Sequence, residues 1–166
     1  MKKVALSGIL VSMAIILAYV ERIFPVGLIV PLPGIKLGLA NIITLFALFY
    51  MDVKSAFTIN ILRCFIASML FGSITSFIFS VSGAVAALAV MALLKAGYGR
   101  YFSIIGISIG GSAAHNIAQI FMASLVLKST AVFAYLTVLL AASLATGLLT
   151  AAVCGSVLAH IDKLKL

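Results

Sequence analysis

Apolar runs long enough to cross a bilayer follow one another along nearly the whole chain. They predict six helices, over residues 4–20, 35–51, 53–71, 75–94, 102–127 and 131–160. A helix needs about 20 predominantly apolar residues to span the hydrocarbon core of a membrane. The pattern therefore predicts an all-α membrane protein in which residues 1–166 form a single transmembrane domain.

Residues 21–34, between the first two runs, have a different character. They hold three prolines, Pro25, Pro31 and Pro33, and two glycines, which interrupt a continuous helix. The apolar stretch 26–30 within them is too short to span. A plain connector is one interpretation, but the apolar content favours a loop that packs on the membrane face or folds over a cavity.

Arg63 stands near the middle of the apolar run 56–71. A guanidinium at the centre of a spanning helix costs about 2.5–3.5 kcal/mol on insertion scales, so it needs a partner, a water-filled cavity or a ligand. At 100° per residue, Asn60 lies one turn away on the same face, together with the small residues Ala56 and Ala67. Two interpretations remain open: a structural arginine bonded to carbonyls of a neighbouring helix, and an arginine that holds a ligand.

Polar side chains also form a stripe along the predicted helix 102–127. Its members are Ser108, Ser112, His115 and Gln119, with Asn116 at the edge. Lipid offers no hydrogen bonds, so this stripe must face protein or water. A lone histidine would more often bond between helices, but the neighbouring Asn116 and Gln119 favour a site.

Lys36 and Asn41 lie near the start of the predicted helix 35–51. A helix N-terminus favours anions through its free N–H groups and its dipole. Lys36 could equally extend its side chain to the membrane interface. Together with Arg63, these positions predict an anion site in mostly apolar surroundings. The candidate ligand-binding residues are Lys36, Asn41, Asn60, Arg63, Ser112, His115, Asn116 and Gln119.

Composition and charge narrow the class of protein further. The chain is 65% hydrophobic and 8% charged, which excludes a soluble globular domain and a disordered chain. The net charge of +8 forms no basic face that would bind nucleic acid. One side of the membrane is expected to collect Lys2, Lys3, Lys54, Lys95, Arg100, Lys163 and Lys165, and the other Arg22, Lys36 and Lys128. The positive-inside rule then places both termini in the cytoplasm and the loop 21–34 outside.

Carboxylates and cysteines are too sparse for most catalytic chemistry. The three carboxylates are Glu21, Asp52 and Asp162, and no two are close in sequence. Paired-carboxylate catalysis and magnesium sites need acids at short spacing, so we expect no catalytic residue, metal or cofactor. Glu21 is expected to be a charge at the membrane interface, with its neighbour Arg22 as a candidate partner. The two cysteines, Cys64 and Cys154, are expected to pack in the core.

Small residues recur at a spacing of four, which lets helices approach closely in a bilayer. The predicted helix 4–20 has two such pairs, Gly8 with Ser12 and Ala14 with Ala18. Longer stripes occur in the last two helices: Gly106, Gly110, Ala114 and Ala118, then Ser143, Gly147, Ala151 and Gly155. These longer stripes are expected to pack within the chain.

Two segments carry a resemblance to a known family: PGIKLGLAN at 33–41 and GISIGGSAAHNIAQ at 106–119. With six short helices and a Pro/Gly-rich outer first loop, they resemble the S components of energy-coupling factor (ECF) transporters. The likeness is to the Gx transporter group, which often carries the label heptaprenyl diphosphate synthase component I. It extends over nearly the whole chain.

The resemblance implies a subunit that captures a small, anionic or phosphorylated vitamin or precursor from outside. Delivery inward would use a membrane-embedded T component and two cytoplasmic ATPases, in a bacterial or archaeal cytoplasmic membrane. In the family a small-residue motif of the first helix docks on the T component. Here Gly8 with Ser12 and Ala14 with Ala18 point to nearly opposite faces, and the first pair, nearer the cytoplasmic end, is favoured.

Two other functions remain open. The synthase label points to a membrane accessory subunit linked to prenyl diphosphate metabolism. The chain has no Asp-rich motif of the kind on which polyprenyl diphosphate synthesis depends, so an enzyme is not expected. A solitary channel or facilitator is the third interpretation.

Overall fold

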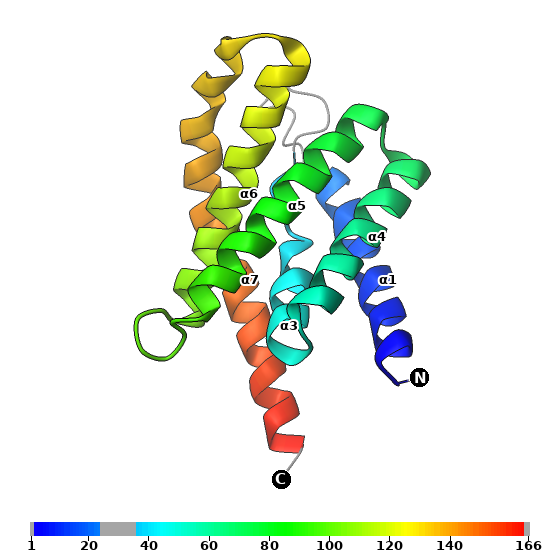
Figure 1. The fold of residues 1–166 in the computed structure, drawn as a ribbon, viewed down its shortest axis with the longest axis vertical. Coiled ribbons are helices and arrows are strands. Elements are labelled where there is room, and N and C mark those ends of the chain that lie inside the picture. The colour runs from blue at the N-terminus through cyan, green and yellow to red at the C-terminus, as the bar shows by residue number, and fades with distance from the viewer. Residues whose placement is uncertain (1, 24–35, 165–166) are drawn as a thin grey trace.

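The chain folds into a bundle of helices in a computed structural model that describes residues 2–23 and 36–164 (Figure 1). Its elements are α1 (Lys2–Ile23), α3 (Asn41–Tyr50), α4 (Val53–Phe71), α5 (Ile74–Lys95), α6 (Ile104–Leu127), the 3₁₀ helix η1 (Thr130–Tyr135) and α7 (Leu136–Leu164). Within the described ranges, five helical segments are long and apolar enough to cross a membrane. They correspond to the predicted runs 4–20, 53–71, 75–94, 102–127 and 131–160, so the all-helical membrane fold is confirmed.

Polar caps fix where three of these helices begin. Asp52, Ser73 and Ser103 precede α4, α5 and α6, and each side chain accepts a hydrogen bond from the backbone N–H three residues later. Such caps satisfy donors that the first turn of a helix leaves free. The short connections between apolar runs therefore carry the signals that start each helix.

The second predicted spanning helix, residues 35–51, is wrong in length. The helix α3 has ten residues, a length of about 15 Å, which is half the hydrocarbon thickness. The preceding residues 36–40 are not helical, and Gly38 has a φ of +88°, a conformation that helices do not use. In Figure 1, α3 lies inside the bundle between α4 and α7. Most of the predicted loop, residues 24–34, lies outside the described residues.

Both chain termini lie at one end of the bundle (Figure 1). The helices α1 and α4 pack side by side and start at that end, where the Lys3 ammonium lies 3.5 Å from the Asp52 carboxylate. At the other end Arg22 donates a hydrogen bond to the Phe71 carbonyl. The remaining helices α5, α6 and α7 pack against one another in chain order.

Small residues bring these helices together. A methyl group on Gly147 of α7 would stand 2.7 Å from the Ile109 Cα of α6. A methyl group on Gly110 of α6 would stand 2.7 Å from Leu94 of α5. The prediction that the longer stripes pack within the chain is confirmed at these two positions, whereas Gly155 has open space beside it.

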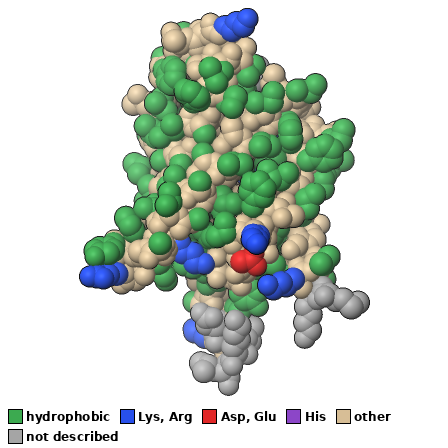
Figure 2. Space-filling model, in the orientation of Figure 1, with side chains coloured by type: hydrophobic (Ala, Val, Ile, Leu, Met, Phe, Trp, Pro, Cys, Tyr) green, Lys and Arg blue, Asp and Glu red, His purple; other side chains and the backbone are tan. Residues whose placement is uncertain are grey.

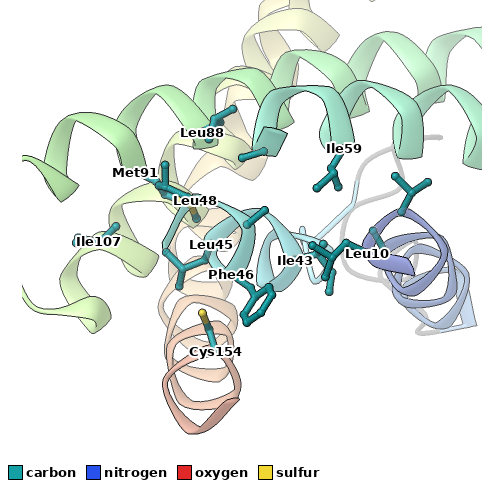
Figure 3. Close-up of a cluster of buried hydrophobic side chains, with 14 residues drawn as sticks. Leu10, Ile43, Leu45, Phe46, Leu48, Ile59, Leu88, Met91, Ile107 and Cys154 are labelled. Atoms are coloured by element: carbon teal, nitrogen blue, oxygen red, sulfur yellow. The ribbon is translucent and has the colours of Figure 1, made fainter. Parts of the chain in front are cut away.

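An apolar cluster surrounds the C-terminal part of α3 (Figure 3). Leu45 and Leu48 of α3 pack with Ile59 of α4, Met91 of α5 and Cys154 of α7. A second cluster joins α5, α6, η1 and α7 and contains Phe79, Ile120, Ala123, Val132 and Leu139. Cys64 and Cys154 are both buried and free, which confirms their expected packing role.

The outer surface separates apolar from basic side chains. Large apolar residues, among them Ile16, Met69 and Leu93, are exposed on the outsides of the helices, as expected for contact with lipid. Figure 2 shows that Lys and Arg side chains gather near the end that holds the termini. This end is the one that the positive-inside rule would assign to the cytoplasm.

Candidate functional site

Arg63 lies inside the bundle, as its position in the sequence required. It is ten residues after the first residue of α4, about 15 Å along the helix. Its side chain is 5% exposed, and the residues predicted to share its face, Ala56, Asn60 and Ala67, are buried with it. The predicted buried face of α4 is therefore confirmed.

A hydrogen-bonded group joins α3 to α4 at this depth. The Asn60 Oδ1 atom accepts one hydrogen bond from Thr44 Oγ1 at 2.7 Å and another from Arg63 Nε at 3.0 Å. The Asn60 Nδ2 and Arg63 Nη2 atoms are buried without a partner. The hydrogen bond found for Arg63 goes to a side chain of its own helix, and part of its guanidinium stays available.

Asn41 lies across from Arg63. The helices α3 and α4 run in opposite directions, and Thr44 is level with Asn60. One turn from that pair toward the same end of the bundle lie Asn41 on α3 and Arg63 on α4. Both polar atoms of the Asn41 amide are buried without a partner. Two strong hydrogen-bonding side chains with unused capacity thus lie at the same level of the bundle.

His115 is held in one protonation state by a chain of two hydrogen bonds. The backbone N–H of Lys36 can only donate, and it donates to Gln119 Oε1 at 3.1 Å. The amide nitrogen of Gln119 therefore faces His115 Nε2, 2.7 Å away, and donates to it. Because Nε2 accepts, His115 is neutral and its proton is on Nδ1. That Nδ1 atom is buried beside the Gly83 backbone of α5, but makes no hydrogen bond of ordinary geometry.

Two glycines make room for the His115 ring. A methyl group on Gly83 of α5 would stand 2.8 Å from Nδ1 of the ring. A methyl group on Gly38 would stand 3.2 Å from Cδ2 of the ring and 2.8 Å from the Asn41 amide. His115 therefore fills a space shared by α5, α6 and the segment before α3.

Glu21 corrects the prediction of a charge at the membrane interface. Its side chain is 3% exposed and accepts a hydrogen bond from the backbone N–H of Gly38. Its neighbour Arg22 is exposed and bonds to the Phe71 carbonyl instead. The dipole at the start of α3 also favours a carboxylate here. The first N–H groups of α3 are themselves bonded to the carbonyls of residues 38–40. Glu21 is therefore an anion of the chain itself, bound just before α3.

The side chain of Lys36 turns into the protein. Its Nζ atom donates to Ser80 Oγ of α5 at 3.0 Å, and it interacts electrostatically with Glu21 and Arg63. This contact replaces the alternative in which Lys36 extends to the interface. Desolvation lowers the pKa of this ammonium from its ordinary value, while Glu21 acts to raise it.

One of the predicted site residues bonds to another helix, and a second has no hydrogen bond that joins it to the rest. Asn116 donates from Nδ2 to the Leu139 carbonyl of α7 at 2.8 Å, so it bonds to a helix on the other side. Ser112 is buried and its hydroxyl has no partner. Of the other six, hydrogen bonds and close contacts join Lys36, Gln119, His115 and Asn41 in one set and Asn60 with Arg63 in another. Arg63 interacts electrostatically with Lys36 and His115, which brings the two sets together.

Sequence reasoning missed three polar members of this group: Glu21, Thr44 and Ser80. Thr44 follows Asn41 by one helical turn, so the wheel of α3 could have indicated it. Ser80 lies among apolar neighbours on α5, and the wheel of that helix could have indicated it in the same way. For Glu21 the available signal was its rarity, because it is the carboxylate nearest in sequence to Lys36.

Most of the unpartnered polar atoms in the site are hydrogen-bond donors. Within these six residues, the buried polar atoms without a partner are Arg63 Nη2, Asn60 Nδ2, Asn41 Nδ2, His115 Nδ1 and Asn41 Oδ1. Four of these donate hydrogen bonds and one accepts. Buried polar groups normally find partners, so a group of this size marks a place for a ligand or ordered water. Donors beside two cations favour an anionic group.

The described residues hold no cluster of three or more His, Cys, Asp and Glu side chains that could bind a metal ion.

The sequence matches one protein family over residues 10–157, and that family is described as heptaprenyl diphosphate synthase component I. The chain belongs to this family. Comparison with curated proteins and with solved structures gives no match. The family membership confirms the resemblance found in residues 33–41 and 106–119.

The family description of heptaprenyl diphosphate synthase component I names part of a larger assembly. On α1, the outward face holds Gly8 and Ser12, which are both exposed. Ala14 and Ala18, on the opposite face, are buried within the bundle. A methyl group on Gly8 would meet no atom within 4 Å. Of the two small-residue pairs, only the first is accessible to another protein.

Proposed function

We propose that this protein is the substrate-binding S subunit of an ECF-type importer. It captures a small anionic ligand from outside and releases it inward, together with a membrane-embedded T component and two cytoplasmic ATPases. Both termini are in the cytoplasm of a bacterial or archaeal cell. Membership of the heptaprenyl diphosphate synthase component I family supports a membrane subunit of an assembly.

The observation that carries this proposal is the unsatisfied polar group around the start of α3. Irregular backbone at membrane depth is tolerated where it is buried in protein or lines a cavity. In transporters, helices that start within the membrane often mark the substrate site. Here the non-helical residues 36–40 are held by Glu21 and Gln119, next to the unpartnered atoms of Asn41, Arg63 and His115.

Native mass spectrometry of gently purified protein tests for a retained ligand. A ligand at concentration [L] stabilises the protein by RT ln(1 + [L]/Kd), so adding it back should raise the unfolding temperature. Arg63→Ala should weaken binding of an anion by roughly 1–3 kcal/mol or more. The matched variant Arg63→Lys keeps the charge and should lose less. Equal affinity in all three proteins would contradict an anion site at Arg63.

Co-purification tests for the partners. If the exposed Gly8 and Ser12 face meets the T component, Gly8→Leu and Ser12→Leu should reduce recovery of the T component and the ATPases. Ser156→Leu is a matched control, because Ser156 is an exposed small residue on α7. Equal loss in the control would show a general defect instead of a docking face.

The family description favours one alternative, an accessory subunit in prenyl diphosphate metabolism. That function predicts recovery of a soluble prenyltransferase from the same purification, without ATPases. Asp-rich segments that could bind magnesium diphosphate are absent from the sequence, so any synthase chemistry would belong to the partner.

A further inference from the structure

Three charged side chains meet around the candidate site, two basic and one acidic. Arg63 and Lys36 supply the positive charges, and both interact electrostatically with Glu21. Glu21 is bound through the Gly38 N–H, and Gly38 lies against Asn41 and His115. The carboxylate is therefore part of the same group as the unpartnered donors.

Three further ionisable groups lie near these charges: His115, Arg22 and Cys64. His115 is neutral, because its Nε2 atom accepts from Gln119. Arg22 is exposed and bonded to the Phe71 carbonyl. If Glu21 is ionised, one carboxylate stands against the two cations Lys36 and Arg63, and the site carries one excess positive charge.

We propose that Glu21 is ionised in the folded protein, where the Gly38 N–H and two cations stabilise its charge. It thereby sets the site to one excess positive charge and selects a ligand whose head group carries a single negative charge, such as a carboxylate. This inference rests on the proposed ligand-binding function. It makes Glu21 a specificity-determining residue, although a ligand need not touch it.

The physical reason is that a second negative charge on the ligand would have no counterion inside the bundle. At an effective dielectric constant of about 20, a unit charge about 8 Å away changes the affinity for another unit charge roughly thirtyfold. A buried charge left without a partner is strongly unfavourable. A phosphate monoester or a diphosphate brings one or more such charges, whereas a carboxylate brings none.

The donor pattern agrees with this charge count. A carboxylate accepts about four hydrogen bonds, and the site offers four unpartnered donor atoms, on Arg63, Asn60, Asn41 and His115. Arg63 can hold a carboxylate with the planar geometry that guanidinium groups favour.

Glu21→Gln is the variant that isolates charge from shape. A glutamine oxygen can still accept from the Gly38 N–H, so the start of α3 keeps its hydrogen bond. Asp52→Asn is the matched control, since it removes one negative charge from an exposed cap at the other end of α4. Asparagine caps helices as well as aspartate does.

The full-length protein is placed in lipid nanodiscs, and its unfolding temperature is titrated with formate, acetate, sulfate and pyrophosphate at constant ionic strength. The wild type and Asp52→Asn should bind formate and acetate more tightly than sulfate and pyrophosphate. Glu21→Gln should raise the affinity for sulfate, relative to the affinity for formate, by roughly thirtyfold. A wild type that prefers sulfate or pyrophosphate overturns the inference, as does a ratio unchanged by Glu21→Gln.

The retained ligand gives a second measurement that does not depend on any variant. Mass spectrometry of the ligand released from wild-type protein should identify a compound with one acidic group ionised at pH 7. A released phosphate ester or diphosphate overturns charge selection while leaving the proposed import function in place. No anion-dependent stabilisation of any of these proteins, together with no retained ligand, would overturn the import function as well.

Discussion

At the scale of single residues, the His115 ring has its place because two neighbours lack a side chain. Gly83 and Gly38 both approach the ring closely enough that one added carbon would overlap a neighbour. The ring cannot simply turn away, since Gln119 holds its Nε2 atom and Lys36 holds Gln119 in turn. The fit of these residues is therefore tied to the position of the segment before α3.

Gly83→Ala should destabilise the protein by about 1–3 kcal/mol, because the added methyl would stand 2.8 Å from the His115 ring. Thermal unfolding of the purified protein in detergent measures the effect. Gly155→Ala provides the control, since nothing lies within 4 Å of its added methyl. Alanine is favoured over glycine inside a helix, so this control should be neutral or stabilising. Equal destabilisation by both variants would contradict the fit around His115.

Asp52 gives a pH dependence at the other end of the bundle. The Ser55 N–H bonded to this carboxylate holds its pKa below the ordinary value of 3.8. An unfolded chain takes up the proton near pH 3.8, whereas the folded chain does so only at lower pH. The contribution of Asp52 to stability is therefore present above that pH and is lost as the pH falls through the folded pKa.

Unfolding temperatures of the wild type and Asp52→Asn, measured from pH 7 downward, check this expectation. The stability difference between the two proteins should be constant near neutral pH and should shrink below pH 3.8. A difference that grows on acidification would mean that the carboxylate is not the stabilising form.

At the scale of elements, α3 is the unusual one, because it begins within the bundle. The turn before it depends on Gly38, whose φ of +88° suits glycine alone. Two backbone N–H groups of this segment are bound by side chains from α1 and α6, Glu21 and Gln119. The start of α3 is thus connected to both helices at the site.

Gly38→Ala should cost more than about 2 kcal/mol of stability, from the left-handed backbone and from overlap with the Asn41 amide 2.8 Å away. Gly99→Ala is the matched control. It has a similar φ of +80° but open space beside it, so backbone strain alone should cost about 1 kcal/mol. Chemical denaturation of the two variants separates the cost of backbone strain from the cost of the overlap with Asn41. Equal costs would show that the contact with Asn41 is unimportant.

Comparison of α3 with α4 and α6 shows what the sequence could predict. The buried faces of α4 and α6 follow from helical periodicity, a local property, and the wheels placed Asn60, Arg63, His115 and Gln119 correctly inside. The break before α3 could not be predicted in this way. It depends on Glu21 and Gln119, which are separated from residues 36–38 by 17 and 83 positions along the chain. The apolar pattern alone predicts one helix over residues 35–51.

The direction of the Asn116 side chain could not be predicted for a related reason. It lies at the edge of the polar stripe on α6, and an edge position can face either neighbouring helix. The Leu139 carbonyl of α7 decides its direction, and no feature of residues 106–119 indicates that carbonyl. A helical wheel gives the buried side of a helix but not which neighbour covers each part of it.

At the scale of the whole molecule, the two ends of the bundle differ in charge. Lys3, Lys54, Arg100 and Lys163 belong to the end with the termini. Lys128 follows α6 at the opposite end, which is also where α1 ends. Lys/Arg bias of this kind orients membrane proteins with the basic end in the cytoplasm. In the proposed orientation, with both termini in the cytoplasm, the candidate site lies nearer the outer side, since Glu21 is in the last turn of α1.

Cysteine labelling in intact cells tests this orientation directly. Lys128→Cys should react with a membrane-impermeant maleimide, whereas Arg100→Cys should react only after the cells are permeabilised. Both positions are exposed, and the native Cys64 and Cys154 are buried, so the wild type should give little background. The reverse pattern would put the termini outside. Capture of a ligand from outside through the site near α3 would then be contradicted, because that site would lie nearer the cytoplasmic side.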